Sequence, residues 1–142
     1  MTSCPFCEMA MRGPLPYAVY EDAAFMVIPD RQSLGPGHCM IIPRHHATKV
    51  YELGEREYAA LFRLAQELAP CLEQATGAKA VGYTAFGSGL PHAHLHLVPH
   101  NDTQVLLRPL EHVRELSESE LVASAVQLRA YVSARLASTE RR

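Results

Sequence analysis

The stretch Pro91-His92-Ala93-His94-Leu95-His96-Leu97-Val98-Pro99-His100 decides the fold. Its first three histidines alternate with apolar residues, and a β-strand sends successive side chains to opposite faces. We therefore predict a strand over residues 90–98 in which His92, His94 and His96 share one face, while the apolar residues face the core. An imidazole row can ligate a metal, attack phosphorus or transfer protons. The rest of the sequence has to decide among these.

The composition is that of a soluble globular protein. Of the 142 residues, 48% are hydrophobic and 20% are charged, with a formal net charge of -2, and the length fits a single domain over residues 1–142. There is no basic excess for a nucleic-acid backbone, although a ligand of nucleotide size needs only a local site. No run reaches the length of a membrane span and the first residues lack a secretory signal. We expect a cytoplasmic protein with no membrane or nucleic-acid partner.

The cysteines are of two kinds. In a cytoplasmic protein thiols stay mostly reduced, so Cys4-x-x-Cys7 is better explained as a metal or redox pair than as a structural disulfide. Cys39 and Cys71 lie among apolar residues, and we expect both to be small core residues.

The rest of the chain predicts an α+β fold with a mostly antiparallel sheet. Strands are expected over residues 18–21, 24–28, 38–43 and 79–86, besides the histidine strand. One long helix between strands should begin at Gly54 and end at Gly77, with a kink or break at Pro70. A capping box, Ser117-Glu118-Ser119-Glu120, belongs to a C-terminal helix, which we place over residues 113–138.

Three ordered motifs resemble the histidine triad (HIT) family of nucleotide hydrolases and transferases. They are the His-x-His-x-His strand, the segment Gly37-His38-Cys39-Met40-Ile41-Ile42-Pro43-Arg44-His45-His46, and Cys4-Pro5-Phe6-Cys7 near the N-terminus. The last motif resembles the zinc-containing bacterial members. The resemblance spans residues 4–99 and implies a HIT-like fold.

The resemblance also implies catalytic roles. His94 matches the nucleophile, which attacks the α-phosphorus of a nucleotide and forms a nucleotidyl-histidine intermediate that water hydrolyses. His38 and His96 match residues that bind the phosphate oxygens. Asp30 lies where the family often has a ribose-contacting residue. The backbone amides of Gly87, Ser88 and Gly89 could approach the phosphate, because glycine removes steric obstruction.

A structural zinc site follows from the same resemblance. Its ligands match Cys4, Cys7, His46 and His92, with His46 favoured over His45 by the family spacing. Two thiolates and two imidazoles complete tetrahedral zinc, and the site would tie an N-terminal segment, residues 1–12, to the sheet. The alternative is a reduced cysteine pair with no metal.

A catalytic metal held by all three strand histidines is disfavoured, because three alternate residues of one straight strand spread over about 13 Å.

The turn before the triad departs from the family pattern. Phe86-Gly87-Ser88-Gly89-Leu90 is short, with Ser88 where a Gln is expected and Gly89 where a hydroxyl residue is expected. We predict a nucleotidyl hydrolase acting on a nucleoside monophosphate phosphoramidate or ester, with adenylate favoured. The alternatives are a dinucleoside polyphosphate hydrolase and a non-catalytic nucleotide-binding protein. The family also suggests a homodimer.

Overall fold

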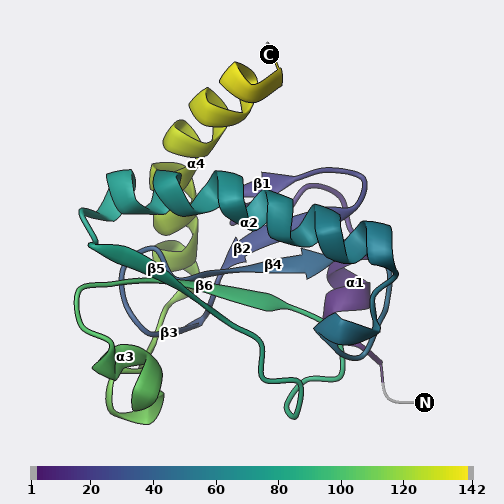
Figure 1. Ribbon diagram of the computed structural model, residues 1–142, viewed down its shortest axis with the longest axis horizontal. Coiled ribbons are helices and arrows are strands. Elements are labelled where there is room, and N and C mark those ends of the chain that lie inside the picture. The colour runs from purple at the N-terminus through teal and green to yellow at the C-terminus, as the bar shows by residue number, and fades with distance from the viewer. Residues whose placement is uncertain (1–2, 141–142) are drawn as a thin grey trace.

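The computed structural model describes residues 3–140 and has the predicted α+β architecture (Figure 1). Within these residues no helix is both long enough and apolar enough to cross a membrane. The elements, in chain order, are α1 (Pro5–Met11), β1 (Tyr20–Glu21), β2 (Phe25–Pro29), β3 (Gln32–Ser33), β4 (Cys39–Pro43), η1 (Val50–Glu52), α2 (Glu55–Thr76), β5 (Ala80–Thr84), β6 (Leu95–His100), α3 (Gln104–Leu107), η2 (Pro109–Glu111), β7 (Arg114–Glu115) and α4 (Glu118–Glu140).

The main sheet is antiparallel throughout, with the strand order β1-β2-β4-β6-β5. Helix α2 lies along one face of it (Figure 1). The central strands β2 and β4 are buried along their whole length, because the α2 core covers one face and a second apolar cluster that includes Phe6 of α1 covers the other. The site described below lies on this second face.

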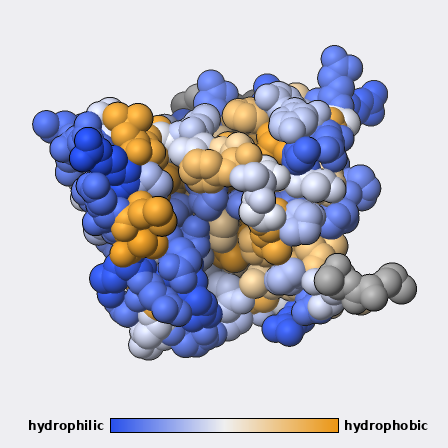
Figure 2. Space-filling view, turned by 90° about the horizontal axis from the view of Figure 1, so that it is seen from below, coloured by the Kyte–Doolittle hydropathy of each residue, from blue (hydrophilic) through white to orange (hydrophobic). Residues whose placement is uncertain are grey.

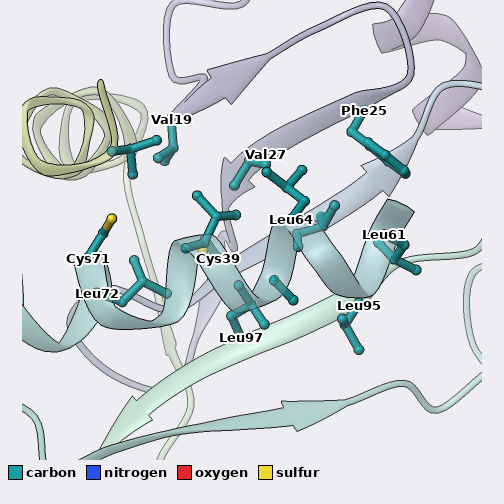
Figure 3. Packing of buried hydrophobic residues seen from close by; sticks show 14 of the residues in the cluster. Val19, Phe25, Val27, Cys39, Leu61, Leu64, Cys71, Leu72, Leu95 and Leu97 are labelled. Atoms are coloured by element: carbon teal, nitrogen blue, oxygen red, sulfur yellow. The ribbon is translucent and has the colours of Figure 1, made fainter. Parts of the chain in front are cut away.

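Residue alternation assigns the two faces. Val27 of β2, Ile41 of β4 and Leu97 of β6 belong to the core under α2, and Figure 3 shows side chains of α2 and of these strands pointing toward one another. Their neighbours Ile28 and Met40 belong to the second cluster. Met40 pairs with His96 across the sheet, and directly paired residues of antiparallel strands point to the same face. His96 therefore lies on the face away from α2.

The histidine strand starts later than predicted. Strand β6 begins at Leu95, and residues 92–94 precede it without a strand partner. The amide of Ala93 instead donates to the carbonyl of Ala47 at 2.7 Å. The alternation of burial still holds around the strand start, because Ala93, Leu95 and Leu97 all lie in the core under α2.

A kink or a break was predicted at Pro70, and helix α2 continues across this residue without a break. A proline removes one helical N–H, which leaves the carbonyl of Gln66 without its usual donor, and Gln66 is exposed to water. The helix has its predicted N-cap Gly54, and Gly77 ends it in the left-handed conformation at φ 74°, which glycine adopts without steric cost.

The C-terminal helix expected over residues 113–138 spans Glu118–Glu140. Residues 114–115 form β7, which pairs with β3 and delays the start of the helix. The capping box forms as predicted: the Glu120 amide donates to Ser117 Oγ at 3.2 Å, and the Ser117 amide donates to Glu120 Oε1 at 3.1 Å.

Candidate functional site

The structure brings the predicted metal ligands into one cluster. The side-chain ligand atoms of Cys4, Cys7, His46 and His92 all lie within 4.8 Å of one another. Cys4 Sγ is 3.2 Å from His92 Nδ1, Cys7 Sγ is 3.2 Å from His46 Nδ1, and the two Nδ1 atoms are 3.1 Å apart. His45, the neighbour of His46, is 79% exposed and lies 3.5 Å from a carboxylate oxygen of Glu57.

The surroundings of His92 favour the tautomer and the neutral form of the ring that can bind a metal. Its Nε2 lies 2.7 Å from the carbonyl oxygen of Pro43. A carbonyl only accepts, so Nε2 carries the proton and the lone pair of Nδ1 points into the cluster. Burial lowers the pKa of His92, which favours the neutral ring that binds a metal. The cluster could therefore hold a metal ion with four side-chain ligands.

The chain around Cys4 and Cys7 folds to present both thiols. Cys4 is the N-cap of α1, and its Sγ accepts the Cys7 amide at 3.5 Å. The intervening Phe6 is buried and packs edge-on against the rings of His92, at 5.6 Å, and His94, at 5.4 Å. The sequence prediction missed Phe6, although an apolar residue between two ligand cysteines was a signal for such packing.

A second cluster lies at the start of β4 and β6. His38 Nε2 is 3.0 Å from His96 Nδ1, and Asp30 Oδ2 lies 3.5 Å from the first atom and 3.4 Å from the second. Asp30 is fixed by the turn that follows β2, where its Oδ1 accepts the amide of Gln32 at 2.9 Å. The structure thus brings together three residues that the sequence predicts to contact a nucleotide.

Both rings of this second cluster are neutral at physiological pH. Burial, reinforced by repulsion between neighbouring imidazoles, lowers the pKa of His38 to about 3 and that of His96 to about 4. The proximity of both rings to Asp30 is therefore not that of ion pairs. Burial also raises the pKa of Asp30, in line with a carboxyl group that has no cationic partner in this cluster.

The tautomers of His38 and His96 follow from one hydrogen bond donated by a backbone amide. The Leu34 amide donates to His38 Nδ1 at 3.0 Å, so the proton of the neutral ring is on Nε2 and is donated to His96 Nδ1. The proton of His96 is then on its own Nε2. With its Nε2 protonated, His38 is a poor metal ligand, although Asp30, His38 and His96 are close enough together to surround an ion.

His94 has the opposite tautomer. Its Nδ1 lies 2.7 Å from the carbonyl oxygen of His92 and must donate to it, which leaves an unprotonated Nε2 with a free lone pair. The ring of His94 lies 5.0 Å from that of His96, centroid to centroid. A potential nucleophile therefore lies beside a ring that presents an N–H donor.

Two pockets meet at this second cluster. One, of about 320 Å³, is lined by residues including Phe6, Ile28, Asp30, His94 and His96. The other, of about 200 Å³, shares Asp30, Gln32 and His96 with the first. Most of its remaining lining is apolar and comes from α3, from η2 and from the residues Leu34, Phe86 and Val113. Seen from the side opposite α2, hydrophobic side chains lie inside a hollow bordered by hydrophilic ones (Figure 2).

The predicted phosphate loop is only partly at the site. Gly87, at φ 78°, lines a further pocket of about 190 Å³ together with His94 and Lys49. Ser88 and Gly89 are exposed and are not among the residues that line this pocket.

Comparison with known proteins shows which sequences this chain resembles. The HIT domain model matches residues 17–103 of the chain. A similar sequence is adenylylsulfatase HINT3 of Arabidopsis thaliana, 28% identical over 109 residues that cover 72% of this chain and 55% of that protein. Another is adenosine 5'-monophosphoramidase HNT1 of Candida albicans, 24% identical over 110 residues that cover 70% of this chain and 72% of that protein.

A solved structure extends the comparison to the fold. A Zn-bound histidine triad family protein from Mycobacterium smegmatis superposes with a TM-score of 0.76 at 22% identity, covering 96% of this chain and 97% of that chain. Because the HIT domain model spans more than half of the sequence and the fold agrees, this chain belongs to the HIT, or histidine triad, family.

Proposed function

We propose that the protein hydrolyses a nucleoside monophosphate phosphoramidate or ester at the α-phosphate, with adenylate as the nucleotide and His94 as the nucleophile. One observation carries the proposal: the bond from His94 Nδ1 to the His92 carbonyl, which leaves the Nε2 lone pair free. The two enzymes compared above, named adenylylsulfatase and adenosine 5'-monophosphoramidase, support adenylate as the nucleotide and hydrolysis as the reaction.

The nucleoside occupies the larger pocket. Phe6, Ile28 and Met40 provide an apolar wall for the base, and the half-buried carboxylate of Asp30 lies in the same pocket, where it can accept a ribose hydroxyl. His94 and His96 line the same pocket. A nucleotide with its base against Phe6 would therefore carry its phosphate to the triad.

The reaction is a double displacement. The lone pair of His94 Nε2 attacks phosphorus, and the bond from phosphorus to the leaving nitrogen or oxygen breaks. The leaving group departs with the electron pair and takes a proton from water. A water molecule then attacks phosphorus, the bond from phosphorus to His94 breaks, and the nucleoside monophosphate is released.

The other rings stabilise charge on the phosphate. The N–H of His96 Nε2 is donated to a phosphate oxygen, and His38 fixes that tautomer through its bond to His96 Nδ1. A preorganised neutral donor of this kind stabilises the developing charge without reorganisation. The amide of Gly87, which borders His94, is the member of the predicted phosphate loop best placed to add a second donor.

Zinc is the metal that suits the cluster of Cys4, Cys7, His46 and His92. Two thiolates and two imidazoles are a common structural zinc set, and tetrahedral zinc with such ligands separates them by roughly 3.3–3.8 Å. The distances from Cys4 Sγ to His92 Nδ1, from Cys7 Sγ to His46 Nδ1 and between the two Nδ1 atoms are within a few tenths of an ångström of this range. With all four positions filled by side chains the metal would stabilise the fold and leave no site for substrate.

The test is turnover of adenosine 5'-phosphoramidate, followed by chromatographic release of adenylate. His94→Asn should abolish turnover while keeping adenylate binding. The matched control is His100→Asn, because His100 makes the same kind of bond from Nδ1 to the carbonyl two residues before it, at 2.9 Å, outside the triad. His100→Asn should keep wild-type turnover. Turnover by His94→Asn would assign the nucleophile to another residue, and an inactive wild-type protein would reject the proposed reaction.

A further inference from the structure

We propose that the pocket lined by Leu34, Phe86, Leu106, Leu110 and Val113, here called the apolar pocket, binds the leaving group and selects an uncharged, ring-sized apolar one. The inference rests on the proposed hydrolysis and adds the class of substrate to it.

The apolar pocket is built onto the catalytic cluster. Its polar end consists of Asp30, His38 and His96, and its remaining wall is almost entirely apolar. Leu106 of α3 covers the backbone of Gly82 in β5, so closely that a Cβ on this glycine would collide with the leucine methyl. The missing side chain at Gly82 therefore allows α3 to approach the edge of the sheet and close the pocket.

The position of the nucleophile assigns the two pockets to the two parts of the substrate. After attack the nucleoside stays attached to the phosphoryl group on His94, so it belongs in a pocket that His94 lines, as the larger pocket with its apolar wall does. The leaving group departs from the side of phosphorus opposite the nucleophile. The apolar pocket fits this side, because it is lined by His96 and His38 and does not include His94.

The far wall of the apolar pocket comes from residues that follow the matched family domain. The HIT domain match ends at residue 103, whereas Leu106, Leu110 and Val113 come from α3, η2 and the residue before β7. Strand β7 holds this segment in place by pairing with β3, next to Asp30. This segment thus completes the apolar lining of the pocket.

Size and polarity define the occupant. The apolar pocket has a volume of about 200 Å³, and an apolar cavity of about 150 Å³ is enough to bind benzene. Among the described residues, Asp30 is the only charged side chain that lines it. A charged leaving group would lose its hydration there without gaining an opposite charge at the apolar end, so a neutral ring or branched alkyl group of about six carbons fits best.

The experiment compares leaving groups of matched basicity. The substrates are adenosine 5'-phosphoramidates of propylamine, of cyclohexylmethylamine and of 6-aminohexanoate. We expect kcat/KM for the cyclohexylmethyl compound to exceed that for the propyl compound by about tenfold or more, the range that a few buried methylenes produce in an apolar pocket. The carboxylate compound should be no better than the propyl one.

Variants connect the preference to the pocket. Leu110→Gln changes a side chain at the rim that is 90% exposed, so folding should be unaffected. It should lower kcat/KM for the cyclohexylmethyl compound several-fold more than kcat/KM for the propyl compound, and so reduce the preference between them. Leu106→Trp fills the pocket and should act in the same direction more strongly. The matched control is Leu107→Gln, since Leu107 is 70% exposed on the same short helix and does not line the pocket.

Each outcome is decisive. Equal kcat/KM for the propyl and cyclohexylmethyl compounds in the wild-type protein would overturn the inference and leave the hydrolysis intact. An equal loss on both substrates in Leu110→Gln would also overturn it, because the pocket would then hold the shared nucleotide. If no compound is hydrolysed, the proposed reaction is rejected, and calorimetric binding of the propyl and cyclohexylmethyl compounds then tests the apolar pocket separately. Tighter binding of the cyclohexylmethyl compound that is lost in Leu110→Gln supports the inference. Equal binding of the two compounds rejects it.

Discussion

Acidification should destabilise this protein through the buried pair His38 and His96. Burial lowers their pKa values to about 3 and about 4, from an ordinary value of 6.5. Between pH 6.5 and these values the unfolded chain binds two protons that the folded protein does not bind. The free energy of unfolding therefore rises with pH in this window, and it falls as the pH is lowered from 7.

The size of the effect follows from the pKa differences. Integrating proton uptake from pH 7 to pH 5 gives a loss of about 1.9 kcal/mol for each histidine, because the folded rings remain neutral over this range. The pair should therefore lower the free energy of unfolding by nearly 4 kcal/mol. A domain of this kind has about 5–15 kcal/mol in total, so the loss should be evident in urea denaturation.

Urea denaturation at pH 7, 6 and 5 measures the effect, and variants isolate it. Protonation of the metal-binding cluster also favours unfolding in acid, so the informative quantity is the difference from wild type. His38→Asn and His96→Asn should each remove about half of the predicted loss. His45→Asn is the matched control, because the side chain of His45 is 79% exposed. In this variant the change in the free energy of unfolding between pH 7 and pH 5 should stay near the wild-type value.

Asp30 should change the pH dependence of the free energy of unfolding in the opposite direction to the two histidines. Its raised pKa means that the folded protein binds this proton before the unfolded chain does, so protonation of Asp30 stabilises the fold towards lower pH. Asp30→Asn should therefore increase the acid loss. The reasoning is refuted if the wild-type protein loses less than about 1 kcal/mol between pH 7 and 5, or if both triad variants keep the wild-type pH dependence.

Three further predictions concern the fold and the metal. Gly37→Ala should lower the free energy of unfolding by about 2 kcal/mol or more, because φ is +82° and a Cβ would lie 2.7 Å from Thr76 Cγ2; a change below 0.5 kcal/mol in urea denaturation would contradict this. Cys4→Ser with Cys7→Ser should remove one equivalent of zinc in elemental analysis, and it should expose α1 to hydrogen exchange, because an isolated helix of 7 residues is unstable; a wild-type protein purified without zinc argues against the site. Ser117→Ala should cost about 1 kcal/mol through loss of the capping box, and an unchanged thermal midpoint would show that the cap adds nothing.

Local sequence patterns were sufficient to predict most of the fold. The period of two in the histidine strand placed Leu95 and Leu97 in the core, and Gly54 and Gly77 marked the ends of α2. The predicted first residue of this strand was wrong, because a strand extends only as far as its backbone pairs with a neighbouring strand. The alternation of side chains does not reveal where this pairing stops. In the part of the chain that the structure describes, no strand pairs with residues 92–94, and the Ala93 amide donates a hydrogen bond to the carbonyl of Ala47, far away in sequence.

The functional details depended on contacts that no local pattern encodes. The tautomer of His38 is set by the Leu34 amide, a backbone group without a sequence signal. The far wall of the apolar pocket comes from residues 104–113, for which the sequence predicted no element other than a helix starting at residue 113. The two short helical turns there are held by β7, which pairs with β3 about 80 residues earlier. Sequence spacing alone does not predict that Cys4, Cys7, His46 and His92 lie together, because the tertiary fold brings them into contact. The prediction of this cluster therefore depended on the family resemblance.

His92 links the two halves of the site. Its ring points Nδ1 into the cysteine cluster and donates Nε2–H to the Pro43 carbonyl, while its own carbonyl accepts from His94 Nδ1. Anything that fixes the His92 ring also fixes the peptide that selects the His94 tautomer. A metal bound by this cluster would therefore orient the nucleophile without touching substrate. Its removal should lower kcat more than it raises KM, because the free lone pair of His94 would be correctly aimed for a smaller fraction of the time.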